Sequence, residues 1–333
     1  MNKFSGILIC TDLDGTLYRN DKTISQENKR AIEYFMSEGG LFTFVTGRLP
    51  YYSKDAYNAV DPNAPFGCIN GGGLYDGRAE TYVWARELPK LSLELVESID
   101  KQFPNVGIQI CCHYKTYFAK ETPHMKEFRR LTGLPDLFCH YREVEEPIAK
   151  VLFGTEDEDE MAAISKTLRE HPLADNFDFI RSERTLFEIL PKGVHKGLAL
   201  SKLVDHLGMD IGRTVAIGDY DNDVGMLGVA RHGIAVANAS PAAKVAADRL
   251  TVSNEDHAIA KVIYDIGYYD AIPALPAVIE HHPPSFIKTS YYFHIFLLFL
   301  LYMRHVVQDI LMKHRGDRYI KSLFRSLCFN YKP

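Results

Sequence analysis

The chain has 333 residues, of which 46% are hydrophobic and 24% charged, and its formal net charge is -5. This composition excludes a largely disordered chain and suits one large or two ordinary globular domains with a sizeable core. The charge leaves no basic stripe of the kind that binds nucleic acid, so no nucleic-acid partner is expected.

Cysteine usage and the N-terminal segment bear on location. The six cysteines stand at positions 10, 68, 111, 112, 139 and 328, without a CxxC pair or a metal-ligand spacing. Their simplest interpretation is reduced thiols. The apolar part of "MNKFSGILIC" is too short for a signal peptide, because charged residues follow it. We therefore expect a cytoplasmic protein.

The first segment predicts a strand, a helix and a second strand. Ile7 to Cys10 would form a buried strand, and an apolar helical period runs from Ser25 to the Gly39–Gly40 stop. The next strand is expected in "LFTFVTGR", which ends at Arg48. This is a βαβ pattern.

The middle of the chain, about residues 84 to 189, has a different rhythm. It contains the strand patterns "NVGIQICCHYKTYFAK", "IAKVLFG" and "NFDFIRSERTLFEIL", with a helical "EDEMAAISKTLREH" between the last two. Strands near turns with amphipathic helices indicate an α+β domain. We expect residues 84–189 to be inserted into a core made of residues 1–83 and 190–270.

After residue 190 strands and helices alternate again. In chain order the elements are a helix in "HKGLALSKLVDHLG" that ends at Gly208, a strand in "TVAIGD", a short helix in "DVGMLGVARHG", a strand in "GIAVANA", and "SPAAKVAADRL", with Ser240 as helix N-cap. Short apolar strands between helices predict a parallel, doubly wound sheet.

Residues 271–333 form a separate linker and tail. From Ser290 onward seven Lys or Arg and two Asp give a net charge of +5. Because the whole chain carries -5, residues 1–289 carry -10. The apolar block Tyr291 to Met303 is shorter than the roughly 20 residues of a membrane-spanning helix. A basic helix on an anionic membrane surface is possible but not favoured over docking on the core, docking on a second subunit, or a tail without order.

Polar residues cluster where the predicted parallel strands end. Asp12 and Asp14 follow the first strand, and Thr46 and Gly47 follow the second. "GDYDND", residues 218 to 223, follows a later strand, and Lys196 opens the helix before it. In an open α/β sheet this edge is the ligand-binding edge. Several carboxylates gathered there would repel one another, and a divalent cation with a preference for hard oxygen ligands, such as Mg2+, would relieve the repulsion.

These motifs resemble those of the haloacid dehalogenase (HAD) superfamily. "DLDGTL", "VTGR", "GVHKG" and "GDYDND" stand in the order that the family shows. The long insert is similar to the larger of its cap types, and "EILPKGVHKGLAL" points to the Cof-type subfamily. The resemblance covers about residues 5 to 270 and implies a Rossmann-like, doubly wound core with an inserted α+β cap.

The resemblance also implies roles. Asp12 would be the nucleophile that forms an aspartyl-phosphate, and Asp14 the general acid and base. Gly15 would permit a tight turn, and Thr16 would bond within the same loop. Mg2+ would be held by the carboxylates of Asp12 and Asp219 and by the main-chain carbonyl of Asp14. The implied phosphoryl-binding residues are Leu13, Thr46, Gly47, Lys196 and Asn222, with Asp223 in an outer shell that orients Lys196 or a metal-bound water.

The resulting expectation is a magnesium-dependent phosphatase acting on a small phosphorylated metabolite, with a sugar phosphate preferred. Two alternatives stay open: a phosphohexomutase with the same core, and a partner- or membrane-binding protein whose phosphatase activity is incidental. Arg48 is either a hinge salt bridge or a substrate contact. For "INGGG", residues 69 to 73, a turn is favoured over a phosphate cradle. The oligomeric state is not predicted.

Overall fold

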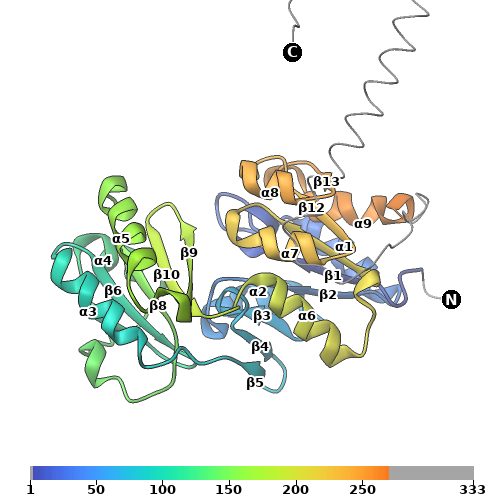
Figure 1. Ribbon diagram of the computed structural model, residues 1–333. Helices are drawn as coiled ribbons and strands as arrows, with labels where there is room; N and C mark the ends of the chain where they lie inside the picture. Colours follow the sequence, from blue (N-terminus) through green and yellow to red (C-terminus); the bar gives the residue numbers. More distant parts are fainter. Residues whose placement is uncertain (1–2, 270–333) are drawn as a thin grey trace, which may run out of the picture. The chain divides into compact units, whose positions relative to one another are not determined.

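A computed structural model describes residues 3–269 of the chain, with side chains to residue 266. Its first sheet is five-stranded and wholly parallel, in the order β13-β12-β11-β1-β2 (Figure 1). The strands are β1 (Leu8–Thr11), β2 (Leu41–Phe44), β11 (Thr214–Gly218), β12 (His232–Ala235) and β13 (Arg249–Leu250). The predicted doubly wound parallel sheet is confirmed.

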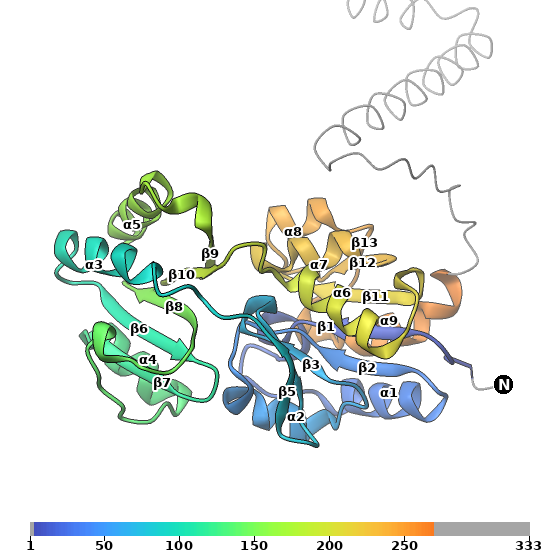
Figure 2. The same cartoon turned by 60° about the horizontal axis from the view of Figure 1, so that its bottom comes forward.

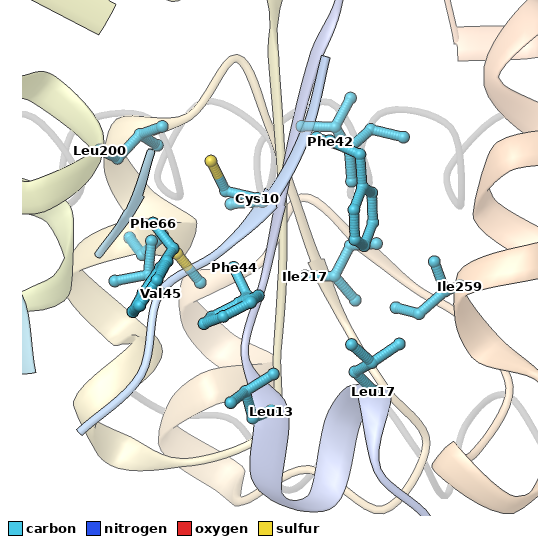
Figure 3. Close-up of a cluster of buried hydrophobic side chains, with 14 of the residues drawn as sticks. Cys10, Leu13, Leu17, Phe42, Phe44, Val45, Phe66, Leu200, Ile217 and Ile259 are labelled. Carbon is cyan, nitrogen blue, oxygen red and sulfur yellow. The ribbon is translucent and has the colours of Figure 1, made fainter. Parts of the chain in front are cut away.

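Helices cover both faces of this sheet. They are α1 (Gln26–Ser37), α2 (Lys54–Val60), α6 (Lys196–Leu207), α7 (Val224–Val229), α8 (Pro241–Ala246) and α9 (Ala258–Tyr269). Figure 3 shows Leu200 of α6 and Ile259 of α9 on opposite sides of the strands. As predicted, Ser240 caps α8 through its side chain and α6 ends at Gly208. Ser25 likewise caps α1, and Gly208 adopts a left-handed conformation.

A short antiparallel sheet was not predicted. It joins β3 (Phe66–Cys68), β4 (Gly73–Asp76) and β5 (Thr81–Ala85), and a bridge between Val45 and Gly67 continues the parallel sheet into β3. β3 and β4 have three and four residues, contain glycine and carry little periodic signal, whereas β5 has the β-branched and aromatic residues typical of a strand and was missed.

The middle of the chain forms the predicted α+β cap. Its antiparallel sheet has the order β7-β6-β8-β10-β9. The cap elements are α3 (Ser92–Gln102), β6 (Gly107–Cys112), β7 (Thr116–Lys120), α4 (Pro123–Thr132), β8 (Ile148–Gly154), α5 (Glu158–Glu170), β9 (Phe177–Glu183) and β10 (Leu186–Pro191). Figure 2 shows α3 and α5 on one side of the sheet and α4 on the other.

Several element ends differ from prediction. The segment "SPAAKVAADRL" is helical only to Ala246, because Arg249 and Leu250 pair with β12 as the edge strand. The helices α3 and α4 of the cap were not predicted. The proposed domain limits fall inside strands, since β5 spans residues 83 and 84 and β10 spans 189 and 190. These limits stay predictions.

Cysteine and membrane predictions bear on part of the chain only. Within residues 3–269 five cysteines are present, and all five are free thiols. Over the same residues, no helix has the length and apolar character needed to cross a membrane. The predictions for the linker, the apolar block and Cys328 lie outside the described residues.

Candidate active site

The turn after β1 places two aspartates at the carboxyl edge of the parallel sheet. Asp12 is buried and its main-chain N–H donates to Ile217 of β11, which fixes it beside the neighbouring strand. Gly15 has φ +80°, and a Cβ there would lie 2.4 Å from Asp219 Oδ2, so the turn requires glycine. Asn238 donates to the Gly15 carbonyl at 2.8 Å and holds the turn from the loop after β12.

Leu13 has its side chain in the hydrophobic core beneath this turn (Figure 3). If Leu13 contacts a phosphoryl group, as predicted, only its main-chain atoms can do so.

Lys196 links two of the predicted acidic residues. It is the first residue of α6 and its side chain is fully buried. Its Nζ lies 2.6 Å from Asp12 Oδ1 and 2.7 Å from Asp223 Oδ1. An ammonium taken out of water needs such partners. The structure thus brings together residues that are 184 and 27 positions apart in the chain.

The turn after β11 supplies the remaining acids. Asp223 Oδ2 accepts from the main-chain N–H groups of Asp219 and Tyr220, so both of its oxygens are used. Thr16 donates to Asp219 Oδ1 at 2.8 Å. The prediction that Thr16 bonds within its own loop is therefore wrong, because the folded sheet brings the β11 turn within reach of its hydroxyl.

Three carboxylates form a compact acidic cluster. One oxygen from each of Asp12, Asp219 and Asp223 lies within 4.8 Å of the others. Burial raises the pKa of Asp12 well above its ordinary value, and Asp223 raises it further against the opposing effect of Lys196. Burial and Asp223 also raise the pKa of Asp219, to about 6. Burial lowers the pKa of Lys196, but the attraction of Asp12 and Asp223 outweighs it, so that pKa is raised.

Asp14 is not a member of this cluster, and its carboxylate is held by basic residues. Arg48 donates to both of its oxygens, at 2.8 and 2.7 Å, and Lys22 donates to one of them at 2.8 Å. Burial raises the pKa of Asp14, but the hydrogen bonds from Arg48 and Lys22 outweigh burial and lower it. In this arrangement Asp14 is ionised, and its bonds to Arg48 and Lys22 make it a weaker base than a free aspartate.

The loop that contains the predicted phosphoryl-binding residues Thr46 and Gly47 is connected through Asn70 to the turn after β11. Thr46 Oγ1 accepts from the Arg48 N–H at 3.2 Å, and Asn222 donates from Nδ2 to Asn70 Oδ1 at 3.0 Å. Asn70 in turn donates to Glu188 of the cap, and Lys150 of the cap donates to the Gly47 carbonyl.

Lys22, Lys150 and Glu188 were not predicted to belong to the site, and Asn70 was expected only as part of a turn. One signal was available. "IAKVLFG" and "LFEIL" each place a charged residue inside an apolar strand, which calls for a buried partner. Asn70 carries a structural signal only, a φ of +51° in a non-glycine residue.

Comparisons with known proteins show which family the chain belongs to. The family model for haloacid dehalogenase-like hydrolases matches residues 9–263. Two proteins of Bacillus subtilis (strain 168), the 5-amino-6-(5-phospho-D-ribitylamino)uracil phosphatases YitU and YwtE, are 29% and 28% identical to the chain. Each comparison covers 77% of this chain and 96% of the relative.

A solved structure has a similar fold. A haloacid dehalogenase-like hydrolase from Bacteroides thetaiotaomicron superposes with a TM-score of 0.69 at 25% identity, over 79% of this chain and all of that one. The predicted resemblance is thereby confirmed. The chain belongs to the haloacid dehalogenase-like hydrolase family and is an enzyme of the phosphatase kind.

Proposed function

We propose that the chain is a magnesium-dependent phosphatase that hydrolyses the phosphate ester of a small sugar or sugar alcohol through an aspartyl-phosphate on Asp12. The observation that carries the proposal is the placement of Lys196 Nζ between Asp12 and Asp223, at 2.6 and 2.7 Å, with Asp219 beside them. A carboxylate that is buried, held by an ammonium and located at the ligand-binding edge suits a nucleophile.

The charges of the cluster fit a divalent cation. If all three carboxylates ionise, Lys196 offsets one negative charge and two remain. In the absence of a metal ion, a bound proton would reduce this excess. The raised pKa values of Asp12 and Asp219 express this excess. Mg2+ bound to Asp12, Asp219 and the Asp14 carbonyl would neutralise the nucleophile and the phosphoryl oxygens.

The side chains suggest how the phosphoryl group is held. Because Thr46 Oγ1 accepts from the Arg48 N–H, its own proton is free to be donated to a phosphoryl oxygen. Lys196 and the Gly47 N–H would bind the remaining phosphoryl charge, and Asn222 has a second amide proton to donate. Positioning and charge neutralisation are the main needs of phosphoryl transfer.

In the first step an oxygen of Asp12 bonds to phosphorus as the bond to the leaving alcohol breaks, and Asp14 gives a proton to that alcohol. In the second step water attacks phosphorus, Asp14 takes its proton, and the bond to Asp12 breaks to release phosphate. Because Arg48 and Lys22 hold Asp14 ionised, its carboxyl must be freed from them to donate a proton.

The substrate class comes from the relatives. Both Bacillus subtilis proteins are named for a substrate whose phosphate is carried by a ribityl chain. Polyol phosphates therefore come first among the candidates.

The test is a screen of the purified protein against phosphorylated metabolites, with and without Mg2+, including sugar phosphates, sugar-alcohol phosphates and 5-amino-6-(5-phospho-D-ribitylamino)uracil. We expect magnesium-dependent release of phosphate from members of this group. Transfer of the phosphoryl group to a second sugar, dependent on a hexose bisphosphate, would instead identify a mutase. Turnover restricted to aromatic or nucleotide esters would reject the substrate class.

A further inference from the structure

The cap contains a buried ion pair that faces the core. Lys150 lies in β8, the central cap strand, and Glu188 lies in the adjacent β10. Their side chains are 7% and 2% exposed, and Lys150 Nζ is 2.8 Å from Glu188 Oε1. Val151 and Ile189 next to them belong to the cluster under α3 and α5, so the charged pair occupies the opposite sheet face. Burying two charges there is costly unless they have further partners.

Both charges find such partners in the core. Lys150 Nζ donates to the Gly47 carbonyl at 3.0 Å. Glu188 Oε2 accepts from Asn70 Nδ2 at 2.9 Å. Asn70 Oδ1 then accepts from Asn222 at 3.0 Å. A continuous chain of hydrogen bonds therefore runs from the Gly47 loop through the cap to the turn that holds Asp219 and Asp223.

The bond from Lys150 fixes one peptide unit of the phosphoryl-binding loop. The Gly47 carbonyl and the Arg48 N–H belong to the same planar peptide, so one cannot turn without the other. That N–H donates to Thr46 Oγ1, so the Thr46 hydroxyl keeps its own proton for another acceptor. The cap ammonium thus holds the peptide that bonds to a residue that, under the proposed function, binds the phosphoryl group.

The core residues of this chain of hydrogen bonds are closely packed and have little room to move. A Cβ at Gly47 would lie 2.9 Å from Asn70 Oδ1, and one at Gly71 would lie 2.0 Å from the His195 carbonyl. Asn70 also donates its main-chain N–H to Thr46. The Asn70 turn is therefore packed between the phosphoryl-binding loop and the start of α6. In the turn after β11, Asn222 Oδ1 is buried without a hydrogen-bond partner among residues 3–269.

We propose that Lys150 and Glu188 are positioning residues: the cap ion pair orients Gly47 and, through Asn70, Asn222, so that the core binds a phosphoryl group tightly only while this pair is in place. The inference rests on the proposed function. It assigns to the cap a part in the chemistry common to all substrates, in addition to any part in selecting among them.

The test separates positioning from stability. Lys150→Met combined with Glu188→Gln removes both charges and the donor to Gly47, while the Gln oxygen still accepts from Asn70. The readouts are the dissociation constant of inorganic phosphate in Mg2+, kcat with p-nitrophenyl phosphate, and the melting temperature. Phosphate has no leaving group for a cap to recognise, so a change in its affinity reports on the core loop.

A matched control lies in the same cap. Lys120 Nζ contacts Asp100 Oδ1 at 2.7 Å and the Phe103 carbonyl at 3.3 Å, a carboxylate and a carbonyl that both belong to the cap. Lys120→Met with Asp100→Asn should leave phosphate affinity and kcat unchanged. For the Lys150 and Glu188 double variant we expect both to fall about 10- to 100-fold, as loss of alignment commonly causes.

A second variant guards against misfolding of the first. Asn70→Gly suits the positive φ and removes the amide between Glu188 and Asn222 without altering the ion pair. It should also weaken phosphate binding. Wild-type affinity in either variant, at a melting temperature within about 4 °C of wild type, would overturn the inference. If the wild-type protein itself neither binds phosphate nor hydrolyses esters in Mg2+, the proposed function fails and the inference falls with it.

Discussion

Two fully or nearly buried lysines, Lys196 in the core and Lys150 in the cap, meet opposite electrostatic conditions. Lys196 faces Asp12 and Asp223 with Asp219 nearby, so negative charge exceeds positive charge. Among the described residues Lys150 forms an ion pair with one carboxylate, that of Glu188, and neutral carbonyl and amide groups complete the hydrogen bonds of the pair. An unbalanced buried cluster is a site for a further cation, whereas a balanced pair can only hold other groups in place.

The largest effect is expected at the nucleophile. Asp12→Asn should abolish turnover, because an amide cannot attack phosphorus, while the fold is kept since Lys196 retains Asp223. Circular dichroism and p-nitrophenyl phosphate hydrolysis provide the measurement. Activity above about 1% of wild type in a clean preparation would show that Asp12 is not the nucleophile, given that removal of a nucleophile costs orders of magnitude.

Metal removal tests the charge excess directly. EDTA should abolish activity and Mg2+ should restore it. The pKa of Asp219 is raised from 3.8 to about 6 in the folded protein, so the metal-free protein loses stability as the pH rises through this range and remains less stable above it. Mg2+ should therefore raise the melting temperature more at pH 7.5 than at pH 5, where protons compete for the site.

The matched variant for this measurement is Asp219→Asn, which should stabilise the metal-free protein and lose the response to Mg2+. Equal stabilisation by Mg2+ at both pH values would mean that the acidic cluster is not where the metal acts. The Lys150 and Glu188 variant should keep its thermal response to Mg2+, because the cap pair carries no excess charge.

The acid and base role of Asp14 predicts an effect that depends on the leaving group. Asp14→Asn should reduce hydrolysis of an alkyl phosphate about 100- to 10,000-fold, and reduce formation of the phospho-enzyme from p-nitrophenyl phosphate much less. Rapid-quench measurement of p-nitrophenol release against steady-state rates on both esters checks this. Equal losses across leaving groups of very different pKa would contradict the acid role.

The smallest effect is expected from the tail. A chain that ends after Tyr269 should keep the kcat/KM and the magnesium dependence of the full chain, because Lys196, Lys150 and the acidic residues of the site lie upstream. Steady-state kinetics of both forms provide the comparison. A folded but inactive short form would show that residues beyond 269 belong to the catalytic unit.

Much of the core could be predicted because its signals are local. An apolar strand followed by Asp12, a helix that begins at Lys196 and a strand followed by Asp219 each stand in a short stretch, and parallel strands bring such ends to one edge. The motif order then predicted the family. The cap's sheet was visible in its strand patterns, whereas α3, α4 and the sheet of β3, β4 and β5 were missed.

The sequence by itself determined the fold class and the family, and it predicted that acidic residues from the turns after β1 and β11 meet. The tertiary structure alone decided how they are used. In the folded protein Thr16 donates a hydrogen bond to Asp219 and Arg48 donates to Asp14. Lys150 donates to the carbonyl of Gly47, which is 103 residues away in the chain. The reason is physical: strand and helix patterns repeat over a few residues, but a side-chain hydrogen bond between distant loops depends on how two packed layers approach, and no local pattern records that distance.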